Sequence, residues 1–178
     1  MASINGVEVK NLNHFKGHEG ETCLQGNVYL NGKKLGFWSQ DSWGGPDLFE
    51  FDETLLDEAR LQFGEGFEET YEHKRACDAL EVFLVTAAWV KRLESEMNRT
   101  FRKGYSVTIF LTDGFHEFRL SIRDDDSDEN LLKTYSEYVE SMKNDLFQNE
   151  QPLMHIFRPG GFDFVVDKDH PAPEIFRR

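Results

Sequence analysis

Three side chains near the start of the chain are of the types that bind zinc in proteins. His14, His18 and Cys23 lie close together in sequence, with Glu19 and Glu21 between them. A structural zinc site usually needs four such ligands in closely spaced pairs, and the spacing here matches no known pattern. We therefore interpret these residues as strand ends with a buried thiol, and we predict no metal. A metal-dependent hydrolase that uses the two histidines and nearby carboxylates is the third of three functional hypotheses.

A second group of side chains has part of the spacing of a calcium-binding loop. Its alternate positions are Asp124, Asp126, Asp128 and Asn130. A calcium loop also needs glycine at its sixth position and glutamate at its twelfth, and those positions hold Glu129 and Tyr135 here. Because the match fails where the geometry is most demanding, the run predicts the solvated start of a helix.

No pattern in the chain indicates a nucleophile or a cofactor. The sequence contains no Gly-x-Ser-x-Gly, no His-Glu-x-x-His and no glycine loop of the kind that holds phosphates. Cys77 lies one position from the apolar stripe of a predicted helix, which is typical of packing. His116 and His155 lie in strand patterns, and we interpret both as histidines at the edge of a core. We predict no catalytic residue, no cofactor and no enzymatic activity.

The negative charge of the chain is concentrated in two windows. Residues 47–81 contain twelve carboxylates against three cations, and residues 124–150 contain nine against two. With the positively charged span between them they give a net charge of −13. Such a field attracts cationic surfaces and repels nucleic acid and anionic membranes. The alternative is that these runs are only solvated faces that keep the protein soluble.

Length and composition favour a folded protein with its own core. The chain has 178 residues, a hydrophobic fraction of 39% and sixteen phenylalanines. Two cysteines are too few for a disulfide framework and indicate reduced thiols in the cytoplasm. The first residues lack a signal-peptide pattern, and the longest apolar run, residues 82–90, is too short to span a membrane. We predict a single acidic domain over residues 1–178, located in the cytoplasm.

Turn chemistry predicts two hairpins with definite pairing. Asn31-Gly32 joins two strands, and residues 7–15 supply a further strand beside them. Asp113-Gly114 joins the second pair of strands. The pairs expected in the first hairpin are Val28 with Leu35 and Gly26 with Phe37, and those in the second are Ile109 with Phe118, Val107 with Leu120 and Tyr105 with Ile122.

Two further turns are rich in glycine and proline. A turn is expected over residues 43–47. Residues 153–157 and 162–166 flank Arg158-Pro159-Gly160-Gly161 and suggest a third hairpin.

Apolar periodicity predicts the helices. A short helix is expected over residues 54–63, ended by Gly64, and a second helix over about residues 129–147. The longest helix ends at Gly104, and its stripe comprises Ala76, Leu80, Phe83, Ala87, Val90, Met97 and Phe101. The later helix is expected to bury Leu131, Tyr135, Tyr138, Met142 and Leu146. The predicted fold is therefore α+β, with antiparallel hairpins packed against one long helix and a second, shorter helix.

Several segments resemble a group of small uncharacterised proteins from phages, prophages and bacteria. Residues 27–36, Asn-Val-Tyr-Leu-Asn-Gly-Lys-Lys-Leu-Gly, resemble the group's tyrosine-x-(aspartate/asparagine)-glycine-lysine-lysine hairpin, and Gly44-Gly45 its following turn. The segments Asp78–Glu81 and Lys103–Tyr105 are also similar. The chain departs from the pattern in its two tryptophans at 38 and 43 and in its acidic segments. The group has no established activity, so the resemblance implies only a phage-like setting, where small acidic proteins often block host nucleases or CRISPR effectors.

The leading hypothesis is a non-enzymatic phage-type inhibitor of the anti-CRISPR or anti-restriction kind. It would bind a basic, nucleic-acid-binding surface of a host nuclease or CRISPR effector by nucleic-acid mimicry, without contacting nucleic acid or membrane itself. Exposed ion pairs contribute only ~0.2–1 kcal/mol each, so such a mimic also needs an aromatic anchor, for which Trp38, Trp43, Phe49 and Phe51 are candidates. The expected partner-binding residues are Trp43, Asp47, Glu50, Asp52, Glu53, Asp124, Asp125, Asp126, Asp128 and Glu129.

The alternative hypothesis is a general protein-interaction or structural module. Such a module could be a homodimer, and its acidity would serve solubility only.

Overall fold

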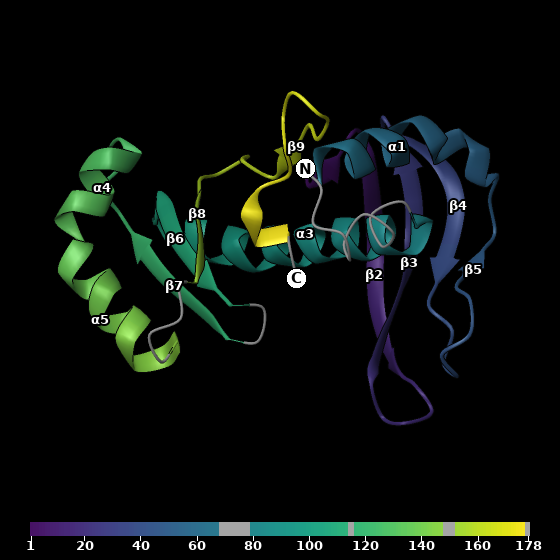
Figure 1. Ribbon diagram of the computed structural model, residues 1–178, viewed down its shortest axis with the longest axis horizontal. Helices are drawn as coiled ribbons and strands as arrows, with labels where there is room; N and C mark the ends of the chain where they lie inside the picture. Colours follow the sequence, from purple (N-terminus) through teal and green to yellow (C-terminus); the bar gives the residue numbers. More distant parts are fainter. Residues whose placement is uncertain (68–78, 114–115, 148–151, 177–178) are drawn as a thin grey trace. The chain divides into compact units, whose positions relative to one another are not determined.

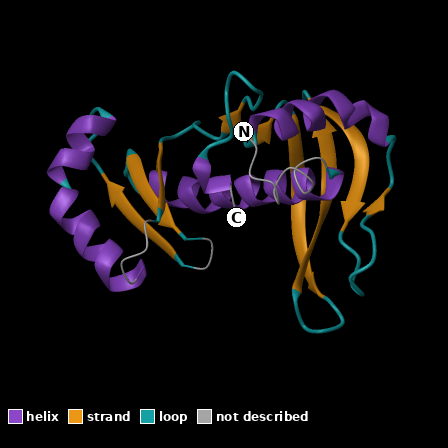
Figure 2. Cartoon of the chain, viewed as in Figure 1, coloured by secondary structure: helices purple, strands orange, loops and turns teal. Residues whose placement is uncertain are grey.

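The computed structural model of the chain describes residues 1–67, 79–113, 116–147 and 152–176. Five strands from the first fifty residues and β9, near the end of the chain, form the larger of its two sheets. The strand order is β5-β4-β3-β2-β1-β9, and every neighbouring pair is antiparallel except β1 and β9. Figures 1 and 2 show that β2 and β3 extend past the other strands as a long hairpin. The bounds are β1 Ser3–Ile4, β2 Val7–Lys16, β3 Thr22–Leu30, β4 Lys33–Ser39, β5 Leu48–Phe49 and β9 Asp163–Phe164.

The described residues group into two compact units. The first unit comprises residues 1–95 and 162–172, and the second comprises residues 96–161 and 173–178. The boundary falls inside helix α3 (Leu80–Phe101). The α+β fold class is confirmed, whereas the single domain over 1–178 stays a prediction. Among the helices that the structure describes, none is long and apolar enough to cross a membrane.

The first hairpin has the predicted turn but a different register. Asn31 and Gly32 both have positive φ, as a two-residue turn of this type requires. Beyond Tyr29 the pairing shifts, because Leu35 is an extra residue in β4, so Val28 pairs with Gly36 and not with Leu35. The predicted pairing of Gly26 with Phe37 is wrong for the same reason.

The shifted register brings Trp38 opposite Gly26 and into the core of the first unit. Its side chain is fully buried, together with Val9 and Val28 on the same face of the sheet. Glycine at position 26 leaves room for the Val9 side chain, because a Cβ there would lie 2.6 Å from a methyl group of Val9. Trp38 is therefore a core residue and cannot serve as an exposed anchor.

Helices complete the core of the first unit. After the 3-10 turn η1 (Glu53–Leu56), α1 (Asp57–Gly66) continues through Gly64, where the sequence predicted its end. The ring of Phe63 in α1 packs 5.0 Å from that of Phe83 in α3. The predicted stripe of α3 is confirmed at its buried members Phe83, Ala87, Val90 and Met97, while Ala76 and Cys77 lie outside the described residues.

The second unit is built on a three-stranded antiparallel sheet in the order β7-β6-β8. Figure 1 shows α4 and α5 along one face of this sheet. On that face Val107, Ile109 and Leu111 of β6 pack in one cluster with Leu131, Val139 and Phe147 of the helices. The bounds are β6 Val107–Thr112, β7 Glu117–Ile122, β8 Leu153–Phe157, α4 Asp128–Thr134, α5 Ser136–Phe147 and the 3-10 turn η2 Glu174–Phe176.

The predicted register of the second hairpin is wrong by two residues. Val107 pairs with Ile122 and Ile109 with Leu120. The connection is longer than the expected two-residue turn: the carboxylate of Asp113 accepts hydrogen bonds from the backbone N–H of His116 at 2.6 Å and pairs with its ring Nδ1 at 2.9 Å. The His116 side chain is 64% exposed, so its interpretation as a histidine at the edge of a core is wrong. Gly114 lies outside the described residues. Because the register is shifted by two residues, the same apolar side chains still lie on the face of the hairpin that was predicted to be buried.

Two further expectations are corrected. Residues 153–157 and 162–166 form no hairpin, because β8 pairs with β6 while β9 pairs with β1 in the other sheet. The helix expected over 129–147 is interrupted at Tyr135, between α4 and α5. The interruption turns Val139 and Phe147 inward and leaves Tyr138 and Leu146 exposed, so the predicted stripe is wrong at those two positions.

Candidate protein-interaction surface

The segment that carries the first acidic window folds as a capped helical pair. Asp52 is the N-cap of η1, and its carboxylate accepts hydrogen bonds from the backbone N–H of Thr54 at 3.0 Å and its hydroxyl at 2.7 Å. These two bonds lower the pKa of Asp52. Leu56 and Phe63 are fully buried on the inner side of the pair. The capped turn therefore fixes which side of η1 and α1 faces solvent.

The solvent side of this helical pair combines carboxylates with leucines. We call it the acidic leucine face: Glu53 and Leu55 of η1, with Glu58, Leu61 and Glu65 of α1. Positions 58, 61 and 65 recur at spacings of three and four and so share one side of a helix. Leu55 and Leu61 are each 51% exposed, which is high for leucine.

The carboxylates of the acidic leucine face have few partners. Glu58 accepts a 3.4 Å hydrogen bond from the side-chain amide of Gln62. Within the described residues, Glu53, Glu58 and Glu65 form no ion pair, whereas Asp57 on the same helix pairs with Arg60 at 3.4 Å. The face is thus both anionic and apolar, a combination that suits a cationic protein surface with apolar patches.

Asp47 is predicted as a partner-binding residue, but its contacts are internal. It is half-buried, and one carboxylate oxygen accepts a 2.8 Å hydrogen bond from the indole Nε1 of Trp38. Its backbone N–H donates to the Glu81 carboxylate at 3.3 Å. Burial raises the pKa of Asp47, the Trp38 hydrogen bond opposes part of that shift, and the Glu81 charge adds to it. Asp47 therefore holds the core tryptophan in place, and Asp52 caps a helix.

Trp43 is the exposed tryptophan of this region, at 73% exposure. Its ring stacks on His18, with centroids 3.9 Å apart and planes inclined by 20°. Asp41 holds the loop beneath it by accepting hydrogen bonds from the backbone N–H of Gly45 at 2.6 Å and of Trp43 at 3.3 Å. Glu50 is also exposed, and its backbone N–H donates to Phe37 at 2.9 Å. Phe49 and Phe51 are partly buried and pack edge to face.

The second acidic window is tied to an arginine of its own unit. The guanidinium of Arg158 donates to the Asp128 carboxylate at 2.6 Å, to that of Asp125 at 3.2 Å and to the backbone carbonyl of Asp126 at 2.6 Å. Asp126 in turn accepts hydrogen bonds from Ser127 N–H at 2.7 Å and the Asn130 amide at 3.0 Å.

Asp125, Asp126 and Asp128 thus make contacts inside the unit, while all the carboxylates from Asp124 to Glu129 remain exposed. The two predicted windows lie in different units, so each is described by itself.

The zinc-type residues at the start of the chain do not form a cluster. His14 and His18 are exposed while Cys23 is buried. Burial raises the pKa of the Cys23 thiol, and the charges of Glu21, Asp41 and Asp47 raise it further, so it is a poor nucleophile at neutral pH. No group of three or more potential metal ligands occurs in the part of the chain that the structure describes.

His155 agrees with its interpretation as an edge residue. It is partly buried, and its ring packs against that of Phe157 with centroids 4.5 Å apart.

The two leucines of the acidic leucine face are not predicted as functional residues from the sequence. The only signal was the apolar residue at 61, on the opposite side of the helix from Phe63.

Comparison with protein-family models, with curated proteins and with solved structures found no match to this chain.

Proposed function

We propose that this chain is a non-enzymatic binding protein that covers a basic, nucleic-acid-binding surface of another protein with its acidic leucine face. The observation that carries the proposal is the mixture, at exposed positions of η1 and α1, of carboxylates that form no ion pair among the described residues with two half-exposed leucines. Such a surface gives a partner both apolar contact and a complementary charge.

The two kinds of side chain have separate roles in this proposal. Burial of the two leucines supplies affinity, at about 25 cal/mol per Å² of apolar surface removed from water. The carboxylates contribute only ~0.2–1 kcal/mol each at an exposed rim, but they accelerate encounter with a cationic partner and exclude anionic ones. Nucleic acid itself is repelled by the net charge of −13.

The choice of partner follows from the resemblance to phage proteins. We propose a host defence protein, either a restriction nuclease or a CRISPR effector, met in the host cytoplasm. RNA-guided nucleases hold their nucleic acid in a positively charged channel, which is the kind of surface that spaced carboxylates can occupy.

A charge-reversal pair tests the proposal. Glu53→Lys with Glu65→Lys changes the acidic leucine face, and Glu137→Lys with Asp145→Lys makes the same change of net charge on exposed positions of α5. Binding to a purified Cas9-type nuclease and to a basic restriction endonuclease is measured by calorimetry at low and physiological salt. We expect the first variant to lose at least about tenfold in affinity, which corresponds to ~1.4 kcal/mol, and the second to bind like the parent.

Leu55→Ser with Leu61→Ser tests the apolar half of the face and should weaken binding at all salt concentrations. The proposal fails if the parent protein binds neither nuclease, or if the two charge variants are weakened equally.

A second function, an interaction or structural module with no cationic partner, is favoured by the Arg158 contacts that neutralise part of the second window. Light scattering after gel filtration separates the two. A salt-independent dimer that does not bind either nuclease would support the module.

A further inference from the structure

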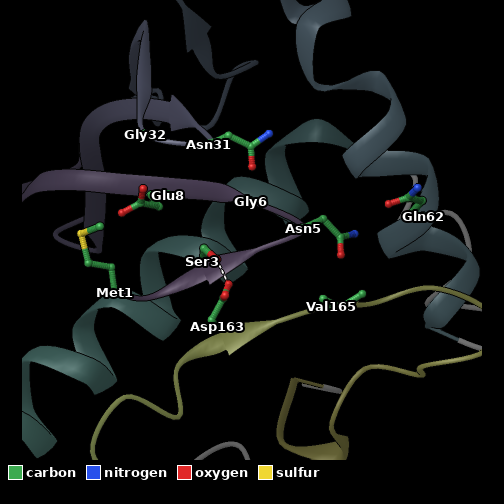
Figure 3. Close-up of a pocket in the computed structure, with 10 residues that line it drawn as sticks. All are labelled: Met1, Ser3, Asn5, Gly6, Glu8, Asn31, Gly32, Gln62, Asp163 and Val165. Carbon is green, nitrogen blue, oxygen red and sulfur yellow. Dashed lines mark hydrogen bonds between the residues drawn. The ribbon is translucent and has the colours of Figure 1, made fainter.

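A polar hollow lies in the first unit where strands β1, β2 and β9 meet two asparagine–glycine turns (Figure 3). Its volume is about 620 Å³, which is within the range of small-molecule sites. The groups that line it include two carboxylates, two amides and two apolar side chains: Glu8, Asp163, Asn31, Gln62, Met1 and Val165. Most ligand pockets are lined by apolar residues, so this lining favours a hydrophilic ligand.

Strand register places the two carboxylates of the hollow in one row. Ile4 pairs with Val7, so Ser3 lies opposite Glu8, and Ser3 pairs with Asp163 on its other side. Side chains in register on neighbouring strands share a face, and strands are about 4.8 Å apart. The Cα atoms of Glu8 and Asp163 are therefore about 10 Å apart, with the Ser3 hydroxyl between them donating to Asp163.

Glu8 is the unusual member of the row, since it is only 6% exposed. The ammonium group of Lys10 contacts one of its carboxylate oxygens at 3.1 Å and lies 4.4 Å from the centroid of the Tyr29 ring. The small exposed part of Glu8 lines the hollow. A carboxylate that reaches the lining of a cavity can accept a charge-assisted hydrogen bond from a ligand donor there.

The wall opposite the row is held rigidly. The amide nitrogen of Asn5 donates to the carbonyls of Ala59 at 3.0 Å and Val166 at 2.9 Å, and its amide oxygen accepts from the backbone N–H of Val166 at 2.7 Å. The Asn31 backbone N–H donates to the Gly6 carbonyl at 2.9 Å, and the Asn31 side chain occupies the space that a Cβ on Gly6 would need. These hydrogen bonds fix the backbone of the two asparagine–glycine turns that form this wall.

The hollow continues toward α1. A smaller cavity of about 230 Å³ shares Asn5, Asn31 and Gln62 with it and reaches Glu58. A third carboxylate thus lies along the same groove. No cationic side chain lines either cavity among the described residues. Lys10 contacts Glu8, and the α-ammonium group of Met1, which is a lining residue, lies 3.6 Å from the Glu94 carboxylate outside the lining.

We propose that this groove binds a short aliphatic polyamine. Its ammonium groups donate to Glu8 and Asp163, with the amide oxygens of Asn31 and Gln62 as further acceptors. Its methylene chain lies against Met1 and Val165, which are 73% and 64% exposed. Because the Cα atoms of Glu8 and Asp163 are about 10 Å apart, a ligand that reaches both needs at least two cations separated by methylenes, and the carboxylates disfavour anionic ligands.

Calorimetry with spermidine tests the inference and needs no protein partner, so its outcome is independent of the proposed nuclease binding. We expect saturable binding of one spermidine per chain. Asp163→Asn keeps an acceptor for the Ser3 hydroxyl while removing the charge, and it should weaken binding at least about fivefold. Glu8→Gln should weaken it at least as much.

The matched control is Glu137→Gln with Asp145→Asn, which removes two charges from α5 and should bind spermidine like the parent. Tetraethylene glycol, an uncharged chain of similar length, should not bind. A second readout is the shift of the Asn31 and Gln62 side-chain amide signals in NMR spectra on addition of spermidine. Absence of saturable binding, or equal weakening in the control and in Asp163→Asn, overturns the inference.

Discussion

The indole nitrogen of Trp38 donates a 2.8 Å hydrogen bond to the carboxylate of Asp47, nine residues further along the chain. Trp38 is fully buried in the core of the first unit, so its N–H has no access to water. Asp47 also contacts Glu81 at the start of α3 through its backbone N–H. Asp47 thus connects a core side chain, the loop before β5 and the start of α3, although its sequence context predicts an acidic surface residue.

Asp47→Ala should destabilise the protein by about 1–3 kcal/mol, because it leaves a buried N–H without an acceptor. Asp47→Asn retains an acceptor oxygen and removes a charge whose burial is unfavourable, so it should cost less. The free energy of unfolding in urea measures both. Glu50→Ala, at an exposed position nearby, is the control and should change stability by less than about 0.5 kcal/mol. Equal losses for Asp47→Ala and Asp47→Asn would contradict the role of the hydrogen bond.

Glu94 should control part of the pH dependence of stability. Burial by itself raises its pKa, but the hydrogen bond and charge of Lys91, with the amino group of Met1 and the amide of Ala2, outweigh burial and lower it. A carboxyl with a lowered pKa in the folded state gives stability that is present above its unfolded pKa, about 4.3, and lost as the pH falls through the folded value.

Urea unfolding from neutral to acid pH checks this contribution. We expect the free energy of unfolding to decrease below about pH 4.3, and Glu94→Gln to be less stable at neutral pH with a shallower acid slope. Glu53→Gln, at an exposed position, should follow the parent. Parallel pH profiles for the parent and Glu94→Gln would show that the Glu94 contacts do not stabilise the fold.

Arg158 should protect the start of α4. Its planar guanidinium makes three contacts at once, with Asp125, Asp126 and Asp128, which a lysine cannot reproduce. Arg158→Lys should speed amide hydrogen exchange in the first turns of α4 while lowering global stability by about 1 kcal/mol or less. Lys133→Arg, which leaves these contacts intact, serves as the control. Unchanged exchange in Arg158→Lys would mean that the three contacts do not order this segment.

Gly36 should tolerate no side chain. A Cβ at this position would contact the backbone carbonyl oxygen of Glu50 and lie 2.8 Å from the Cβ of Phe51. Because backbone atoms cannot move aside cheaply, Gly36→Ala should cost about 1–3 kcal/mol in thermal or urea unfolding. Lys34→Ala, at an exposed position of the same strand, should be nearly neutral. A stable Gly36→Ala variant would show that the 50–51 segment can detach from β4.

Local patterns predict the elements of this fold better than their partners. The Asn31-Gly32 turn and the stripe of α3 depend on neighbouring residues only; the turn is confirmed, and the stripe is confirmed at its four buried members. Registers are wrong where a distant contact decides them: the Glu50–Phe51 backbone lies against Gly36 beside the extra residue Leu35. Likewise, the turn at residues 158–161 carries no sign that β8 joins one sheet and β9 the other.

The candidate surface was harder to predict than the fold. Charge alone does not separate a carboxylate that binds a partner from one that accepts an internal hydrogen bond, as with Asp52 and Thr54. Exposure of Leu61 depends on which side of α1 packs on the core, and Phe63 decides that through its contact with Phe83. In the second acidic window, Arg158 forms an ion pair with Asp128, which lies thirty positions earlier in the sequence, so sequence proximity gives no sign of this contact.

The pairing of β1 with β9 has a consequence for synthesis of the chain. Ser3 and Ile4 are synthesised about 160 residues before their neighbours Asp163 and Phe164, and the whole of the segment 96–161 is made in between. At translation rates of about 5–20 residues per second, one edge of the nascent sheet stays open for roughly ten to thirty seconds. During that interval the exposed edge of β1 is available to chaperones or to neighbouring nascent chains, and a stop codon before residue 163 would leave it open permanently.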